Sequence, residues 1–201
     1  MTQDDWSARL TSAFARNIRR RRNGRGLSAQ QLADACAGIG HAIPRSVLAN
    51  LESGRREVVN LAEVLVLAEV LEVSPVELMI PLGDVADFEV LPGRTVPATA
   101  AMQWIRGEAP LPGSTWDGGS DGSSVVASYL VHQQTIDRWH WNRAYAELIR
   151  KGEREGTETD AQRHDQEAER ARSELVGLRR LMKLRELSLP EPPPLMALPG
   201  A

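Results

Sequence analysis

Cysteine is nearly absent from this sequence, since Cys36 is the one thiol in 201 residues. A single cysteine excludes an intrachain disulfide and any zinc site built on several cysteines. Aromatic residues are also few, with two Phe, two Tyr and five Trp. A hydrophobic core must therefore consist mainly of Leu, Val and Ala, although the apolar fraction of 42% is typical of a globular chain.

Long hydrophobic runs are absent as well. No apolar stretch approaches the roughly 18–20 residues that a membrane-spanning helix needs. The N-terminus MTQDDWSARL has no signal-peptide core, so we predict a cytoplasmic protein with no membrane partner. The four histidines lack metal-ligand spacing, and neither a Gly-rich phosphate loop nor a Ser–His protease pattern is present. We predict no enzymatic activity, no metal site and no cofactor.

Charge is unevenly distributed, although the net charge is only −3. Residues 14–56 carry nine Arg against two acidic residues, a balance of +7, whereas residues 57–91 carry eight acidic residues and no Lys or Arg. Such a division indicates one face that meets an anionic partner. Arg also outnumbers Lys by 22 to 2, a bias typical of GC-rich genomes, so not every Arg requires a functional reason.

The first 83 residues predict five helices. The expected spans are 5–22, 28–36, 44–53, 60–73 and 74–81. Their ends carry recognisable signals: Ser28 and Gln31 form a capping-box pattern, Pro44 is a favourable first-turn residue, and Gly54 ends the third helix. These signals predict a compact all-helical domain.

The remainder of the chain divides into three predicted parts. Residues 84–123 are rich in Pro, Gly and Ser and predict a linker with a short packed segment around 100–106. Residues 124–188 carry two helical patterns, at 124–151 and 160–187. The tail 189–201 is Pro-rich and is expected to be disordered. The predicted fold class is all-α, with a domain at 1–83 and a helical hairpin or coiled coil at 124–188.

The last helical pattern contains a seam typical of helix association. Leu175, Leu178 and Met182 follow the alternating spacing of three and four residues found in coiled coils. We expect them to join two copies as a homodimer. The alternative is that the same seam closes an intrachain hairpin against Tyr129, Ile136 and Trp139, and both uses are compatible in a four-helix arrangement.

The segment RSVLANLESGRR, residues 45–56, has two contrasting sides at 100° per residue. Val47, Leu48 and Leu51 share the apolar side. The opposite side is small and polar and contains Arg45, Ser46, Ala49, Asn50 and Ser53. Two arginines follow Gly54 directly.

Residues 27–79 resemble the helix-turn-helix domain of the Cro/C1-type (XRE) regulators. The resemblance rests on Leu27-Ser28 opening the second helix, on LESG closing the third, and on LAEVLEVSP before the fifth. It implies that helix 44–53 enters the major groove of double-stranded DNA while the second helix lies across the backbone.

The resemblance places the base-reading positions at Arg45, Ser46, Ala49 and Asn50. Arg45 has the donors for guanine O6 and N7, and Asn50 suits adenine N6 and N7. The expected phosphate contacts are Ser28, Gln30, Arg55, Arg56, Arg21 and Arg22. Solvation of a helix end is the alternative for the arginines of 19–22.

Two features depart from the family pattern. Ala29 occupies the position where the family usually has Gln, so Gln30 is the substitute we expect. The turn AGIGHAIP between the second and third helices is about five residues longer than is usual in the family. His41 in this turn is expected to be exposed.

Together these observations predict a bacterial or phage-derived transcriptional regulator, a repressor, that binds a two-half-site operator as a dimer and is associated with the nucleoid. Repression or activation would follow from the position of the operator. Two alternatives stay open. One is a sensor in which residues 84–187 bind a small-molecule effector, with Trp104, Trp116, Trp139 and Trp141 as candidate lining residues. The other is an antitoxin-like module that binds a protein partner.

Overall fold

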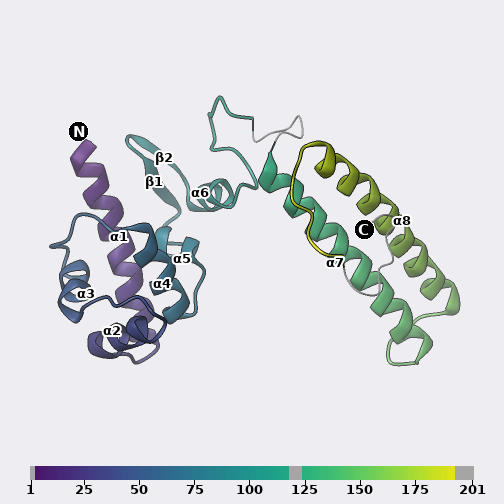
Figure 1. Ribbon diagram of the computed structural model, residues 1–201, viewed down its shortest axis with the longest axis horizontal. Coiled ribbons are helices and arrows are strands. Elements are labelled where there is room, and N and C mark those ends of the chain that lie inside the picture. The colour runs from purple at the N-terminus through teal and green to yellow at the C-terminus, as the bar shows by residue number, and fades with distance from the viewer. Residues whose placement is uncertain (1–2, 118–123, 193–201) are drawn as a thin grey trace. The chain divides into compact units, whose positions relative to one another are not determined.

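The computed structural model describes residues 3–117 and 124–192 (Figure 1). The described residues are mostly helical with one small two-stranded sheet, which confirms the predicted all-α class. The chain divides into two compact units, residues 1–116 and 117–201.

Five helices form the first part of the N-terminal unit, as the sequence predicts. They are α1 (Gln3–Gly24), α2 (Ala29–Gly38), α3 (Arg45–Glu52), α4 (Leu61–Leu71) and α5 (Pro75–Met79). Their apolar faces meet in one core, in which Ile18, Leu32, Leu48 and Leu67 have no exposed surface. The spacing of apolar residues therefore determines which face of each helix points inward.

Capping interactions explain where several helices begin. The Ser28 hydroxyl accepts the Gln31 N–H while Gln31 accepts the Ser28 N–H, and Asn60 and Glu63 form the same reciprocal pair. These bonds satisfy backbone groups that have no partner inside the helix. Gly54 follows α3 with a φ of +74°, a conformation that favours glycine and ends the helix.

A β-hairpin and a sixth helix follow α5 within the segment that the sequence predicts as a linker. Strand β1 (Asp87–Leu91) pairs antiparallel with β2 (Arg94–Pro97), and α6 spans Ala98–Ile105. The α6 helix overlaps residues 100–106, where the sequence predicts a short packed segment, and the sequence analysis does not predict the β-hairpin. Ile80, Val90, Val96, Ala101 and Leu111 form a second small core there.

The hairpin is tied to the start of α1 by Glu89. The Trp6 indole N–H donates to the Glu89 carbonyl oxygen at 3.2 Å, and the Arg9 guanidinium donates to the Glu89 carboxylate at 2.6 and 2.9 Å. The Gly93 N–H and the Arg9 hydrogen bond lower the pKa of Glu89. Residues 80 positions apart in the sequence are thus joined within one unit.

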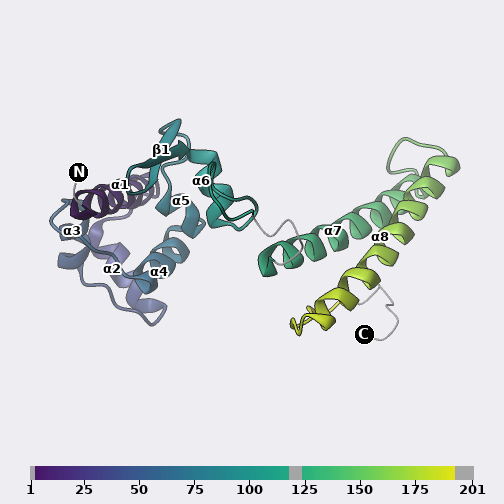
Figure 2. The ribbon, with the colours of Figure 1, turned by 90° about the horizontal axis from the view of Figure 1, so that it is seen from above.

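The C-terminal unit is a helical hairpin of α7 (Val125–Arg150) and α8 (Glu158–Leu184), which run antiparallel along their length (Figures 1 and 2). Buried alanines line the contact: Ala146, Ala161, Ala168 and Ala171. Small side chains let two helices approach closely. Ile136, Trp139 and Leu175 fill the centre of the interface.

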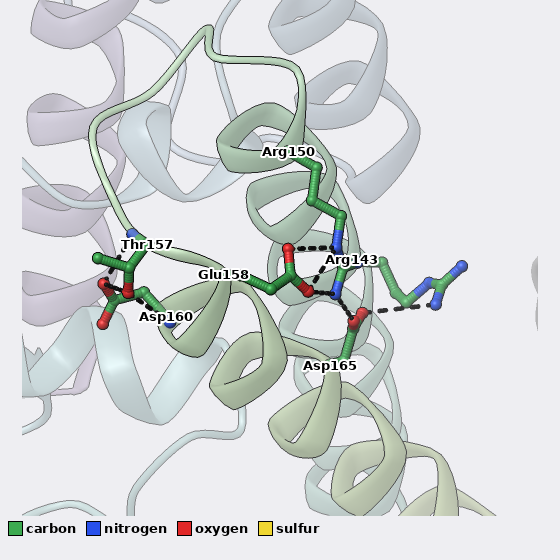
Figure 3. Close-up of polar contacts among 6 residues, drawn as sticks. All are labelled: Arg143, Arg150, Thr157, Glu158, Asp160 and Asp165. Atoms are coloured by element: carbon green, nitrogen blue, oxygen red, sulfur yellow. Dashed lines mark hydrogen bonds and ion pairs between the residues drawn. The ribbon is translucent and has the colours of Figure 1, made fainter.

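Polar contacts close the turn between the two helices (Figure 3). Thr157 and Asp160 form a capping box at the start of α8. Arg150, at the end of α7, donates to Glu158 at 3.0 Å and to Asp165 at 2.6 Å. These bonds fix the register of α8 against α7.

Residues after α8 fold back onto the hairpin. The Tyr129 hydroxyl donates to the Ser188 carbonyl oxygen at 2.5 Å, and Arg179 donates to the Pro190 carbonyl oxygen at 2.6 Å. The prediction of a disordered tail at 189–201 falls largely outside the described residues, which end at 192. No helix of the described residues is both long enough and apolar enough to cross a membrane.

Candidate nucleic-acid interface

Helix α3 presents a polar face because its apolar side chains are fixed in the core. Leu48 and Leu51 are buried, and Ile43 anchors the chain just before the helix. Arg45, Ser46, Ala49 and Asn50, the four predicted base-reading residues, are all exposed. Val47 is half-buried against the core.

The polar groups of this face are available to a partner. In the described part of the chain, no hydrogen bond or ion pair engages the side chains of Arg45, Ser46 or Asn50. A guanidinium and an amide separated by five positions on one exposed helix match the donors and acceptors of base edges in a major groove.

The position of α3 is held by a bidentate ion pair between Arg22 and Glu52. Arg22 Nε and Nη2 donate to the two Glu52 carboxylate oxygens, each at 2.7 Å, and Nη1 donates to the Leu27 carbonyl oxygen at 2.7 Å. The side chains are only 12% and 10% exposed, and the hydrogen bond that Arg22 donates to Glu52 raises the pKa of Arg22. One guanidinium therefore joins the end of α1, the entry to α2 and the end of α3.

Most arginines of the predicted phosphate-binding cluster have carboxylate partners. Arg21 donates to Glu77 at 2.8 Å, and Arg20 pairs with Asp84. Arg22 uses three donors inside the domain. Arg16 and Arg19 on α1 are exposed, and the described residues provide no carboxylate for either.

The two arginines after α3 also differ in whether a carboxylate of the same domain pairs with them. Arg56 donates to Glu63 at 2.7 Å, and the Glu63 side chain is only 9% exposed. Arg55 is exposed and has no ion pair within the described ranges. The sequence does not distinguish these neighbours, because the Arg56 partner lies in the next helix.

At the start of α2, the predicted side-chain contacts are already used within the helix. The Ser28 hydroxyl is occupied by its capping role, and Gln30 Nε2 donates to Asp34 at 2.7 Å. The backbone N–H groups of Ala29 and Gln30 belong to the first turn and have no partner within the helix. This terminus therefore offers backbone donors and a partial positive charge to an anion.

The long turn between α2 and α3 covers residues 39–44. Gly40 has a φ of +91°, which reverses the chain, and buried Ile43 returns it to the core. His41 is exposed, as expected, and Ile39 is 52% exposed. The additional residues are therefore accommodated in a surface loop and leave α3 packed in the domain.

Residues 13–79 match the family model of a helix-turn-helix domain. The match covers about a third of the chain, from within α1 to the end of α5. It confirms the predicted helix-turn-helix DNA-binding domain of a regulator, while the narrower Cro/C1-type assignment stays a prediction. No curated protein and no solved structure matched the chain.

The residues predicted to join two copies lie mainly inside one hairpin. Leu175 has no exposed surface and Met182 is 2% exposed, whereas Leu178 is half-buried. Leu175 contacts Ile136 and Trp139, two of the residues named in the intrachain alternative. The seam at Leu175 and Met182 is thus filled within the chain.

The four tryptophans of the sensor alternative have different surroundings. Trp104 packs against the second small core, and Trp116 is 42% exposed. Trp139 is buried between α7 and α8, while Trp141 is 57% exposed. No group of three or more His, Cys, Asp or Glu in residues 3–117 and 124–192 is placed to hold a metal ion.

Proposed function

We propose that this chain is a sequence-specific regulator of transcription that binds double-stranded DNA with α3 in the major groove. The observation that carries the proposal is the exposed face of α3, on which Arg45 and Asn50 have no side-chain partner among residues 3–117 and 124–192, while Arg22 and Glu52 hold the helix in place. A fixed helix with unpaired donors is suited to read bases, because little ordering is needed on binding.

In this proposal, Arg45 contacts a guanine and Asn50 an adenine, with Ser46 and Ala49 at the neighbouring bases. Arg55 and the N–H groups at the start of α2 contact phosphates. Arg56 has a smaller role because Glu63 already neutralises it. Such phosphate contacts fix orientation and carry no sequence information.

The proposal includes a dimer on a two-half-site operator. One domain of this size contacts about half of a typical site, and dimers of helix-turn-helix proteins read half-sites about 10 base pairs apart. The narrower Cro/C1 membership, repression by an operator that overlaps a promoter, and a location on the nucleoid belong to the same proposal.

The test is fluorescence anisotropy of the full chain on tiled duplexes from upstream of its own gene, with random duplex as competitor. Tight binding to one tile is expected. Arg45→Ala and Asn50→Ala should each reduce discrimination by about 1–3 kcal/mol while retaining binding to random duplex. Gln133→Ala, an exposed polar residue of α7, is the matched control.

Equal, weak and salt-sensitive binding to every tile would contradict the proposal. That result would favour the alternatives in which a small-molecule or protein effector is required. Specificity that is unchanged in both α3 variants would contradict the assignment of the base-reading residues.

A further inference from the structure

One face of the C-terminal hairpin leaves large apolar side chains exposed. Val131 is 43% exposed, Trp141 is 57% exposed and Leu181 is 59% exposed. We call this surface the hairpin face. Its residues are Val131, Arg138, Trp141 and Tyr145 on α7, and His164, Glu174, Leu178 and Leu181 on α8.

Contacts across the two helices show that these residues share a face. The α7 residues recur at intervals of seven, three and four positions, which keeps them on one side of the helix. Arg138 forms an ion pair with Glu174, and the rings of Tyr145 and His164 lie 4.7 Å apart. Leu178 and Leu181 follow Glu174 by one and two turns of α8 and therefore lie on its side.

The hairpin face has a different chemistry at each end. Val131, Leu178 and Leu181 form an aliphatic end near the start of α7. At the other end, Trp141 stacks on Tyr145 at 4.8 Å with an interplanar angle of 23°, and His164 packs edge-on against Trp141 at 5.3 Å. The Arg138–Glu174 pair lies between the two ends.

This order makes the face complementary to itself. The ten residues between Val131 and Trp141 span about 15 Å of helix. A two-fold axis that runs parallel to the helices near the ion pair would place α7 of one hairpin on α8 of another, with aliphatic end on aliphatic end and aromatic end on aromatic end. The same axis would bring Arg138 close to the Glu174 of a second copy, so that charges of opposite sign meet at the centre.

We propose that the hairpin face docks on the same face of a second copy, which produces an antiparallel four-helix arrangement. The interface covers Trp141 and Leu181, which the isolated hairpin leaves in water, and removal of this apolar area from water drives association. The inference rests on the dimer of the proposed function and places its interface at residues other than buried Leu175 and Met182.

The first test compares the mass of full-chain variants by sedimentation equilibrium. The wild type should be a dimer, and Trp141→Glu and Leu181→Glu should each weaken self-association at least tenfold. Val126→Glu is the matched control, because Val126 is 46% exposed but lies on another side of α7. Unchanged circular dichroism would show that the variants remain folded.

A charge-reversal experiment separates contacts between chains from those within a chain. Arg138→Glu alone and Glu174→Arg alone should each weaken self-association, because each places like charges at the centre. An equimolar mixture of the two should form a heterodimer, although neither chain recovers its internal ion pair. A mixture as weakly associated as either variant alone would overturn the proposal.

Two further results would overturn the inference in distinguishable ways. A wild-type dimer that survives both Trp141→Glu and Leu181→Glu would contradict this interface and leave the proposed dimer intact. A monomeric wild type whose Trp141 fluorescence resists iodide quenching would mean that another part of the chain covers the face. In that case the dimeric operator complex would also be contradicted. Binding of α3 to a single half-site does not require the dimer and would be tested separately by the anisotropy measurement.

Discussion

The N-terminal unit and the C-terminal hairpin place their charged and apolar groups in different ways. In the N-terminal unit, the core is closed on several sides by five helices, and most arginines are paired with carboxylates of the same unit. Within the part of the chain that the structure describes, Arg45 and Arg55 are exposed and form no ion pair, and both lie at or beside the polar face of α3. In the hairpin, two helices share a narrow interface lined by alanine, and Trp141 and Leu181 lie outside it.

This difference indicates two kinds of partner. A closed core with free cations at its surface suits an anionic partner that need not bury apolar area. A two-helix layer with apolar residues on its outer face suits another apolar surface. We therefore propose that the N-terminal unit reads DNA and that the hairpin joins two copies, and each role can be tested in its own unit.

The largest effect is expected from the ion pair that holds α3. Glu52→Ala leaves the Arg22 guanidinium largely buried without a carboxylate, so the free energy of unfolding should fall by about 3 kcal/mol. Urea unfolding measures this change. Glu72→Ala removes the partner of Arg25 at an exposed site and should change the free energy of unfolding by less than about 1 kcal/mol. Equal effects of the two substitutions would show that the α3 pair has no special role.

A substitution that disturbs the close packing of α7 and α8 should lower the free energy of unfolding by a similar or smaller amount. Ala171 is fully buried between α7 and α8, and leucine there would force the helices apart at a cost of about 1–3 kcal/mol. Thermal unfolding followed by circular dichroism provides the measurement. Ala144→Leu on the exposed side of α7 is the control and should be close to neutral. A stable Ala171→Leu variant would contradict the narrow interface.

The two arginines after α3 should differ in their contribution to the salt dependence of DNA binding. Arg55→Ala should reduce the slope of log K against log salt concentration by about one, as expected for one lost phosphate contact. Arg56→Ala should change the slope less, because Glu63 already pairs with Arg56. Anisotropy titrations from low to high salt measure both slopes. The reverse order would show that the Arg56–Glu63 pair opens on DNA.

The smallest predicted effect is the pH dependence of the hairpin. His132 is 1% exposed and lies 3.3 Å from Arg179, and burial followed by the Arg179 charge lowers its pKa. The unfolded state then binds a proton at a higher pH than the folded state. Stability is therefore complete above about pH 7 and falls as the pH drops below about 6.5. His132→Gln should flatten this dependence in unfolding measured at pH 7.5 and 5.5, and a slope unchanged by the substitution would contradict it.

Local signals were sufficient to predict most helices. Capping residues such as Ser28 and Asn60, apolar spacing and Gly54 act within a few residues of each other, so a single sequence contains them. The exposed positions of α3 followed from the same periodicity. The β-hairpin at 87–97 is not predicted, because the surrounding Pro and Gly residues indicate a linker. Its Pro92-Gly93 turn between apolar segments is nevertheless a turn signal.

Pairings between distant residues were not predictable in the same way. The partners of Arg21, Arg22 and Arg56 lie 7 to 56 positions away, and the sequence does not indicate which arginine each acid meets. The apolar seam of α8 posed a similar difficulty. Its spacing shows that Leu175 and Met182 face another helix, but the spacing is the same whether that helix belongs to the same chain or to a second copy.

Base reading by α3 is tested most directly by selection from a random duplex library, performed in parallel with the wild type and Arg45→Ala. We expect one enriched motif with two half-sites for the wild type. The variant should lose the preference for guanine at one position in each half-site and retain the other positions. A motif that is identical for both proteins, or no enriched motif for the wild type, would contradict base reading by α3.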